Sequence, residues 1–580
     1  MRLIGIVEND FLLRAYAIYG WFKRCPVTVF GQNSSGFTNY MNRYLIAIDD
    51  RIGTYHGAWY KIQKWMVCDS SYIKHLDIEN KILVKIQCKI FKSKKVVNYY
   101  KHYLSHIEYK LLRDKILAGD ITNDYCFILP NLYSYRLLVK CYLKKDEYIL
   151  SNFLSVLHIV FACYYIIGYI LKILKIKLKI NKQIKGLVLK KLAWGFGGVG
   201  LKDDMLVDNS SIYLTDMVYY VSKNTIKSEE LKLLKLTKNL NINLIKVSNE
   251  FNINKKFFDF ILSNVILGMP LLFYSIIFKP FIFYGLISFL IRSMGTYKLL
   301  SFCDTKYYWS VGNWDDIVET IIANRYKMRM FMYSWSDCAQ CYLYTFTYTV
   351  QDDVFMWGPI EEKYMIQKSL HENMFTIGCL FSNNFIETNK EEVCKNFNLD
   401  PNKPVVVFFD SPVNNRMRFP QSLFDQFREI ILLVEQKYPN VQIVLKPKTV
   451  TDEYIEYFRG SSVKLFDGKD IYLGDIINIA TLNVGMGIVA PITISLIMNK
   501  PGIFFETAGN YDSPFAKYEG ELVFRDQESL LNKIDQILTG QFSSIIINEL
   551  KDYNVPGSNP VEILREYVTT GKVEEKYRLH

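Results

Sequence analysis

The C-terminal third of the chain alternates between continuous apolar runs and amphipathic stretches. The apolar runs are short and rich in β-branched and aromatic residues, and they occupy 404–410, 441–445, 463–466, 482–484, 502–505 and 522–524. Such runs are typical of strands that are buried on both faces of a parallel sheet. The stretches between them have helical periodicity, as at 423–434, where the apolar residues share one face. This alternation predicts a doubly wound α/β sheet over residues 375–545.

Small and polar residues follow the predicted strands at their carboxyl ends. In a doubly wound sheet, this is the edge at which ligands bind. Small residues let the backbone approach a phosphate, Lys and Arg supply positive charge, and a carboxylate can hold a ribose hydroxyl. We therefore expect a nucleoside mono- or diphosphate at this edge. The predicted contacts are Ser411, Arg416, Arg418, Lys446, Lys448, Gly485, Gly487, Thr493, Ser495 and Glu506.

Two apolar stretches precede this region. Residues 153–171 carry no formal charge and approach the roughly 20 residues that span a bilayer, and the lysine-rich segment 172–185 follows them. Residues 258–291 are interrupted by Pro270 and Pro280, which favours an interfacial or re-entrant helical hairpin over a straight spanning helix. Burial in a large core is the alternative for both stretches. For the first, spanning, surface attachment and burial are all open. We favour monotopic attachment, because one crossing would separate the halves of a domain.

Charge is unevenly distributed along the 580 residues. The formal net charge is +12, but residues 375–580 hold 21 Lys and Arg against 27 Asp and Glu, so the first 374 residues carry +18. A basic part beside a mildly acidic one indicates that the basic part meets an anionic surface. Cys338 and Cys341 form a lone C-x-x-C without the second pair that a zinc site normally needs. We expect reduced thiols and no metal site. Residues 1–11 are interpreted as a first strand, because Glu8 and Asp10 do not fit a signal peptide.

Several motifs over residues 300–550 resemble a known family. They are Lys327–Tyr333 with Ser334–Asp337, Asp352–Pro359, Phe375–Phe381, Gly485–Gly487 through Lys500-Pro501, and a possible terminal helix at 556–569. With these motifs the chain resembles the GT-B glycosyltransferases of bacterial surface-polysaccharide synthesis. It is more distantly similar to polysialyltransferase-like and CDP-glycerol-transferase-like enzymes. Lys446-Pro447 stands where the related sialyltransferases carry His-Pro, so CMP specificity does not carry over.

The resemblance implies two Rossmann-like domains that face a cleft. Residues 1–355 would form the acceptor-side domain with the apolar insertions 153–171 and 258–291, and 356–374 would cross to the nucleotide-sugar-binding domain at 375–545. Residues 546–580 would form a tail whose helix returns to the first domain. The implied reaction is a metal-independent, inverting transfer from a nucleotide-activated sugar, without a cofactor. The implied acceptor is a glycan, lipid-linked or close to the membrane, at the cytoplasmic face of the bacterial inner membrane.

An inverting transfer needs a base near the acceptor hydroxyl. Among carboxylates expected at strand ends of the first domain, Asp337, Glu8 and Asp10 are favoured over Asp304. His371, in the predicted crossing, is a weaker candidate. The glycine-rich loop Trp194–Gly200 does not clearly follow a strand, so the sequence supports a hinge as well as a phosphate-binding loop.

Two other functions fit the same fold. One is the transfer of a polyol phosphate from a CDP carrier, which only the donor distinguishes from sugar transfer. The other is a non-catalytic subunit of a polysaccharide assembly complex. Nucleic-acid binding is not expected, because the basic charge lies beside apolar segments and no recognition motif is present.

Overall fold

The computed structural model describes part of the 580-residue chain. The described residues are 80–105, 150–181, 250–278, 280–310, 317–334, 348–361, 370–379, 390–410, 421–447, 450–466, 473–507, 509, 511–541, 550–555 and 557–579, with short strands at 2–7, 27–31, 45–46, 126–129, 184–185, 187–190, 217–221 and 243–246.

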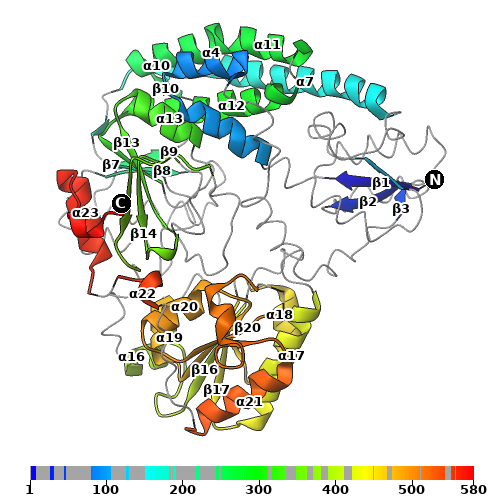
Figure 1. Ribbon diagram of the computed structural model, residues 1–580, viewed down its shortest axis with the longest axis vertical. Helices are drawn as coiled ribbons and strands as arrows, with labels where there is room; N and C mark the ends of the chain where they lie inside the picture. The colour runs from blue at the N-terminus through cyan, green and yellow to red at the C-terminus, as the bar shows by residue number, and fades with distance from the viewer. Residues whose placement is uncertain are drawn as a thin grey trace. The chain divides into compact units, whose positions relative to one another are not determined.

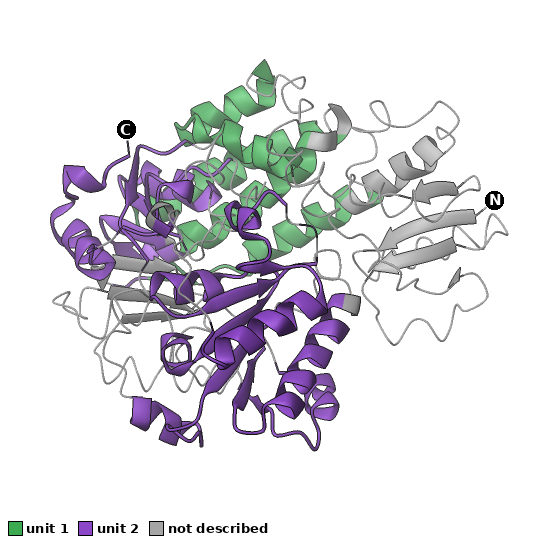
Figure 2. Ribbon diagram, turned by 60° about the horizontal axis from the view of Figure 1, so that its bottom comes forward, with its two compact units in different colours: residues 1–54, 68–179, 249–298 green, residues 55–67, 180–248, 299–580 purple. Residues whose placement is uncertain are grey.

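The chain divides into two compact units, each assembled from separated segments (Figure 2). The first unit contains residues 1–54, 68–179 and 249–298, and the second contains 55–67, 180–248 and 299–580. The predicted crossing at 356–374 therefore falls inside the second unit.

The C-terminal part of the second unit is built on a six-stranded parallel sheet. The strands are β16 (Val405–Phe409), β17 (Gln442–Lys446), β18 (Lys464–Leu465), β19 (Leu482–Met486), β20 (Gly502–Phe505) and β21 (Val523–Phe524). Their spatial order is β18-β17-β16-β19-β20-β21, and every neighbouring pair is parallel. Numbered along the chain, this is the 3-2-1-4-5-6 order of dinucleotide-binding sheets. The predicted fold class, α/β with a doubly wound parallel sheet, is confirmed.

Helices cover both faces of this sheet (Figure 1). One group is α17 (Gln421–Lys437) with α21 (Gln527–Leu538), and the other is α16 (Lys390–Asn396), α19 (Leu473–Ile479) and α20 (Ala490–Ile497). All five residues of β16 are buried, because a strand between two helical layers has no solvent face.

A second parallel sheet in the same unit has seven strands. They are β7 (Leu187–Lys190), β8 (Met217–Val221), β9 (Asn243–Lys246), β12 (Tyr307–Ser310), β13 (Arg329–Tyr333), β14 (Asp353–Met356) and β15 (Asn373–Thr376). The order β15-β14-β13-β12-β7-β8-β9 becomes 7-6-5-4-1-2-3 when the strands are numbered along the chain. It therefore repeats the order of the six-stranded sheet with one strand added. Phe375, the predicted entry to the C-terminal domain, lies in the last strand of this sheet.

The first unit contains a separate parallel sheet and a group of helices. The sheet has the order β3-β2-β1-β4, with β1 (Arg2–Val7), β2 (Val27–Gly31), β3 (Leu45–Ile46) and β4 (Cys126–Leu129). Residues 1–355, predicted as one Rossmann-like domain, thus contribute to two main parallel sheets in different units. The main helices are α4 (Ile82–Phe91), α7 (Leu150–Leu174), α10 (Lys255–Phe260), α11 (Gly268–Phe278) and α12 (Pro280–Phe302).

The two prolines of the predicted hairpin have different effects. Pro270 does not break its helix, because a π-helical turn over Ile261–Ile266 joins α10 to α11 and widens the helix just before it. Pro280 does mark a break, since α11 ends at Phe278 and α12 begins at Pro280.

Within the described residues, Lys255–Ile276 is the one helix whose length and composition would allow it to cross a membrane. Its mean hydropathy is 1.7, and 33% of the window is buried.

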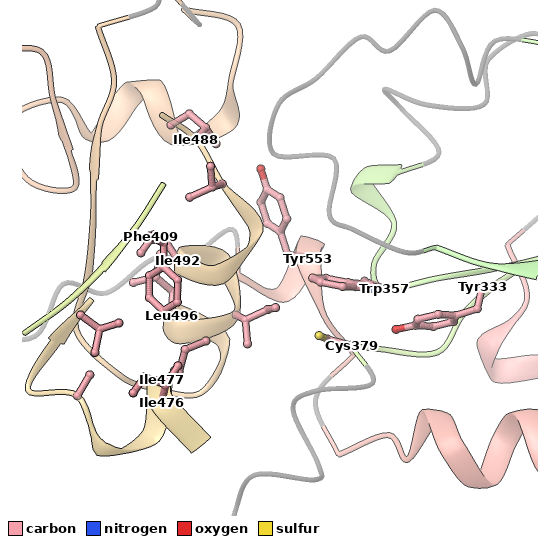
Figure 3. Close-up of a cluster of buried hydrophobic side chains, with 14 of the residues drawn as sticks. Tyr333, Trp357, Cys379, Phe409, Ile476, Ile477, Ile488, Ile492, Leu496 and Tyr553 are labelled. Carbon is pink, nitrogen blue, oxygen red and sulfur yellow. The ribbon is translucent and has the colours of Figure 1, made fainter. Parts of the chain in front are cut away.

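The C-terminal segment packs against residues 377–379, just after β15. Asn554 follows α22 (Leu550–Tyr553) and accepts a hydrogen bond from the Cys379 N–H at 2.8 Å, and the Ser558 hydroxyl donates to the Ile377 carbonyl at 2.7 Å. The Tyr553 ring stacks on Phe515 at 4.9 Å, within a core that also includes Trp357 (Figure 3). Residues 550–558 therefore contact elements of both sheets of the second unit.

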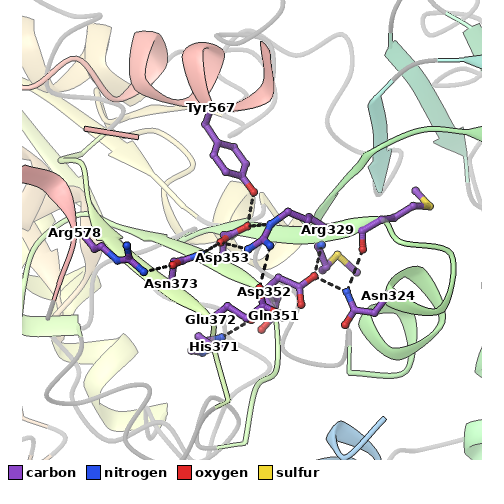
Figure 4. Close-up of polar contacts among 12 residues, drawn as sticks. Asn324, Arg329, Gln351, Asp352, Asp353, His371, Glu372, Asn373, Tyr567 and Arg578 are labelled. Carbon is purple, nitrogen blue, oxygen red and sulfur yellow. Dashed lines mark hydrogen bonds and ion pairs between the residues drawn. The ribbon is translucent and has the colours of Figure 1, made fainter. Parts of the chain in front are cut away.

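A buried carboxylate then fixes the last helix, α23 (Pro560–Thr570), to the seven-stranded sheet (Figure 4). Asp353 is 1% exposed and receives Arg329 Nε at 2.8 Å and Nη2 at 2.6 Å. Asn373 donates to the same carboxylate at 2.6 Å, and the Tyr567 hydroxyl of α23 donates to it as well. Burial, followed by the neighbouring Asp353, raises the pKa of Tyr567, which therefore stays protonated as the donor. The carboxylate is satisfied by four donor groups from three other segments.

Candidate functional site

The strand order of the six-stranded sheet locates its ligand edge. The chain connections run in opposite directions from β16 and β19, which are neighbours, so a crevice is expected beyond their carboxyl ends. Phe409 of β16 is in register with Lys446 on one side and with Gly485 on the other. With strands about 4.8 Å apart, the Lys446 and Gly485 backbones flank β16 at a separation of about 10 Å. The carboxyl ends of β16, β17 and β19 therefore lie at one level of the sheet.

The turn after β19 is built closely against α20. The Gly487 N–H donates to the Phe505 carbonyl at 2.6 Å, and Gly487 has a φ of 72°, which a residue with a side chain rarely adopts. At Gly485, an added Cβ would lie 2.6 Å from Ile492 Cγ1 and 2.7 Å from Val489 Cγ2. Glycine is therefore required at 487 for the turn and at 485 for the close packing of α20.

Glu506 follows β20 and is fully buried. Its carboxylate accepts a hydrogen bond from the Ile488 N–H at 3.3 Å. The carboxylate thus holds the β19–α20 turn from the neighbouring strand. This position beside the turn suits the predicted contact with a nucleoside, and in the described structure the same side chain also has a structural function.

Two hydroxyl groups of α20, those of Thr493 and Ser495, differ in their hydrogen bonding. Ser495 donates to the Pro491 carbonyl at 2.7 Å, so its proton is used within its own helix. Thr493 is fully buried in the same helix, and its hydroxyl has no hydrogen-bond partner among the described residues. A buried hydroxyl without a partner is costly, and this one lies one helical turn beyond the β19 turn.

Arg525 and Tyr511 lie beside Glu506 and were missed by the sequence analysis. Arg525 donates from Nη1 to the Glu506 carbonyl at 3.1 Å, and its guanidinium lies 4.1 Å from the centre of the Tyr511 ring. Its Nη2 is buried without a partner among the described residues. The available signal was that Arg525 directly follows the strand at 523–524, as the other predicted contacts follow their strands.

A polar chain supports the end of β16. Asp410, directly after the strand, accepts a hydrogen bond from the Tyr454 hydroxyl. Arg428 of α17 lies 4.7 Å from the Tyr454 ring centre and donates to Glu453 at 2.7 Å. Burial, with the nearby Asp410 as second cause, raises the pKa of Tyr454 and keeps its hydroxyl protonated. This chain orients Asp410 at the crevice edge.

Of the other predicted contacts, Lys446 ends β17 and is partly buried. The remaining predicted contacts and bases lie outside the described residues, namely Ser411, Arg416, Arg418, Lys448, Asp337, Glu8 and Asp10. For these residues the roles stay predictions.

The weaker candidates have defined places. Asp304 ends the short strand β11 (Cys303–Asp304) and is exposed. His371 lies just before β15, with Nδ1 2.8 Å from the Gln351 carbonyl and Nε2 3.2 Å from the Thr349 hydroxyl. Both ring nitrogens of His371 are thus occupied by hydrogen bonds within the protein.

The sequence interpretation of the glycine-rich loop needs a correction. The sequence shows no clear strand before residues 194–200, but β7 ends at Lys190, four residues before Trp194. Moreover, β7 is the first strand of the seven-stranded sheet in chain order and neighbours β12, the fourth. The neighbours β7 and β12 thus form the switch point of this sheet, and residues 194–200 themselves lie outside the described residues. The strand at 187–190 was obscured by its lysine-rich surroundings.

The tight packing at Gly485 leads to a stability prediction. Replacing Gly485 with Ala should lower the free energy of unfolding by about 1 to 2 kcal/mol, because the new methyl group overlaps two branched side chains of the β19–α20 unit. Urea unfolding followed by circular dichroism measures this change. The control is Gly295→Ala in α12, where the added methyl meets open space and should stabilise the helix. Equal effects of the two substitutions would contradict the packing described here.

Several solved structures and one protein family are similar to the chain. No curated protein matches the sequence. Among solved structures, the chain is similar to a glycosyltransferase from Rickettsia africae ESF-5, with 11% identity, a TM-score of 0.35, and coverage of 67% of this chain and 100% of that one. It is similar to MurG from Acinetobacter baumannii, with 8% identity, a TM-score of 0.32, and coverage of 66% and 99%. It is also similar to the wall teichoic acid polymerase TagF, with 10% identity, a TM-score of 0.41, and coverage of 82% and 98%.

These TM-scores lie below 0.5, so we assign the fold from the strand orders themselves. The family model described as "Polysaccharide biosynthesis PFTS motif protein" matches residues 314–534. This range includes β13 to β15 and the whole six-stranded sheet. Over residues 314–534, the predicted resemblance to the proteins of polysaccharide biosynthesis is therefore confirmed.

Proposed function

We propose that the protein is a glycosyltransferase that binds a nucleotide-activated sugar at the carboxyl edge of the six-stranded sheet and transfers the sugar to a glycan acceptor in polysaccharide synthesis. The observation that carries this proposal is the β16–β19 switch point, where a glycine turn with positive φ leads into α20. That arrangement suits a phosphate, because it combines close backbone approach with a helix N-terminus.

The residues around the turn would divide the recognition of the donor among them. Lys446, at the end of β17, and the α20 N-terminus would meet the negative phosphates. The Glu506 carboxylate would accept hydrogen bonds from ribose hydroxyls, and the Thr493 hydroxyl would donate to a donor oxygen. Arg525, whose Nε pairs with Glu519 at 2.8 Å, and Tyr511 offer a flat guanidinium and aromatic surface beside Glu506. No metal is included, because the basic side chains and the helix N-terminus would stabilise the leaving phosphate.

The proposed chemistry is a single displacement with inversion. The acceptor oxygen attacks the anomeric carbon, the bond from this carbon to the phosphate oxygen breaks, and the acceptor proton passes to a carboxylate base. Asp337, Glu8 and Asp10 remain the proposed bases. The acceptor is proposed to be a lipid-linked or membrane-proximal glycan.

A panel of donors tests the proposal. We expect the full chain to bind at least one of the UDP-, GDP-, dTDP-, CDP- or CMP-linked sugars by calorimetry and to hydrolyse or transfer it slowly. Selective binding of CDP-glycerol would favour the alternative, a polyol-phosphate transferase. A folded chain that binds no nucleotide would reject both enzymes. If Lys446→Ala and Glu506→Ala leave glycan production intact in cells, the protein is a non-catalytic subunit.

Thr493→Val separates a ligand contact from a structural one. The substitution keeps the side-chain shape and removes a hydroxyl that has no partner among the described residues, so stability should stay equal or rise slightly. Donor affinity should fall roughly threefold to tenfold, the value of one neutral hydrogen bond. Thr493→Ser retains the hydroxyl and serves as the control, and it should keep most of the affinity. Loss of stability without loss of affinity would show that this hydroxyl has a structural function only.

A further inference from the structure

Helix α7 of the first unit has apolar residues on two opposite faces. Ala162, Ile166 and Tyr169 are buried in a core shared with α11 and α12. A second stripe is exposed and recurs at the helical spacing of three and four residues, and it consists of Val160, Tyr164, Ile167, Leu171 and Leu174. Tyr164 and Leu174 are 70% and 72% exposed. Isolated exposed apolar residues are common, but a continuous stripe over four turns indicates a surface that is covered in the functional protein.

The helix from α10 to α11 has the same two-sided character. Its inner side contacts α12, because Asn264 accepts a hydrogen bond from the Ser293 hydroxyl at 2.6 Å and Leu272 is buried in the core shared with α7. Its outer side exposes Phe258, Leu262, Ile266, Phe273 and Tyr274. Figure 1 shows α7, α10 and α11 along one side of α12. The two exposed stripes therefore belong to helices that share one core in the same unit, and together we call them the apolar helical surface.

Lysines gather at one end of this apolar helical surface. The strand after α7, β5 (Lys177–Lys179), pairs with β10 (Glu250–Asn252), which leads directly into α10. This pairing brings the C-terminal end of α7 and the N-terminal end of α10 together. Their exposed lysines are Lys172, Lys175, Lys177, Lys179 and Lys255. Glu250 pairs with Lys179 at 2.8 Å, so the end remains strongly positive.

We propose that the apolar helical surface lies in the interface of an anionic lipid bilayer, with α7 and α10–α11 parallel to the membrane plane and the lysines on the headgroups. Aromatic and aliphatic side chains flanked by lysine are typical of interfacial helices. A protein partner fits less well, because lysine is depleted in the cores of protein interfaces. A spanning arrangement fits less well too, because each helix uses one face to contact α12 and Arg292 is exposed in the middle of α12.

Vesicle flotation tests this surface without any donor, so its outcome is independent of the proposed enzymatic activity. The purified full chain should float with vesicles of phosphatidylcholine and phosphatidylglycerol in roughly equal parts, and much less with phosphatidylcholine alone. Neutralising Lys175 and Lys177 to Gln should weaken binding to the anionic vesicles about fivefold for each lysine.

A double substitution, Ile167→Asp with Phe258→Asp, tests the apolar part. Binding should fall at least about tenfold, because each carboxylate must be dehydrated to enter the interface. The matched control is Ile455→Asp on α18 (Asp452–Tyr457) of the second unit, where the residue is 52% exposed and binding should not change. Thermal unfolding of all variants shows that they remain folded.

Four outcomes would overturn the proposal. They are the absence of vesicle binding by the full chain, equal binding by the double variant, a loss of self-association in place of lipid binding in that variant, and retention of the chain in native membranes after an alkaline wash. The third outcome would assign the surface to a second copy of the chain, and the fourth would assign a spanning helix.

Discussion

Arg329→Met is expected to lower the free energy of unfolding by about 3 kcal/mol, since removal of one partner leaves the buried Asp353 carboxylate without its cation. Arg329 supplies two of the four donor groups on this carboxylate, and Asn373 and Tyr567 supply the others. The two remaining donors and the 40% exposure of the Arg329 side chain keep the cost at the lower end of the range for broken buried pairs. Chemical unfolding at neutral pH measures the change.

A matched control and a double substitution make this prediction specific. Arg459→Met removes an ion pair with Glu456 whose partners are 72% and 65% exposed, and it should change stability by less than about 1 kcal/mol. Adding Asp353→Asn to Arg329→Met should restore part of the loss, because the uncompensated charge is then gone. If Arg329→Met and Arg459→Met have the same small effect, the network around Asp353 does not stabilise the fold.

The predicted elements of the C-terminal third agree closely with the structure, and the reason is local. The strand predicted at 482–484 lies in β19, and the helical stretch predicted at 423–434 lies in α17. Burial between two helical layers requires a short continuous apolar run, and the length of the run and its β-branched and aromatic residues identify such strands locally. The spatial order 3-2-1-4-5-6 depends on pairing between distant segments, which no local pattern encodes. The order was needed to identify β16 and β19 as the neighbours that define the site.

The basic N-terminal part was harder to interpret because its short strands carry many lysines. The strand β7 follows Lys185 closely, ends in Lys190 and is followed by Lys191, and its short apolar core gave no clear signal. The sequence therefore did not show that a strand precedes the glycine-rich segment 194–200. Pro270 predicted an interruption of the helix that the structure does not have, since a π-helical turn accommodates this proline without a break. Arg525 directly follows the run predicted at 522–524, so the signal for it was present in the sequence.

Glu506→Gln is expected to weaken donor binding by roughly 10- to 150-fold, the value of a hydrogen bond to a charged group, while leaving the fold nearly intact. Glutamine has the same shape and keeps an oxygen that can accept from the Ile488 N–H, now 3.3 Å from the carboxylate. It loses the negative charge that strengthens hydrogen bonds from donor hydroxyls. Calorimetry with the best donor of the panel measures the affinity, and chemical unfolding measures the stability.

The control for Glu506→Gln is Glu453→Gln, which changes a half-exposed carboxylate that pairs with Arg428 at 2.7 Å on the outer side of the polar chain at β16. Glu453 lies in α18 of the same unit, and its substitution removes the same charge and should reduce donor affinity less than about threefold. An equal loss in both variants would mean that the donor senses net charge only. A large loss of stability with unchanged affinity in Glu506→Gln would show that the carboxylate holds the β19–α20 turn and has no contact with the donor. The Glu506 carboxylate accepts a hydrogen bond from the Ile488 N–H in the glycine turn, so the carboxylate could act on the donor or only on the turn. A loss of donor affinity with intact stability supports the proposed site, and a loss of stability with intact affinity rejects Glu506 as a contact.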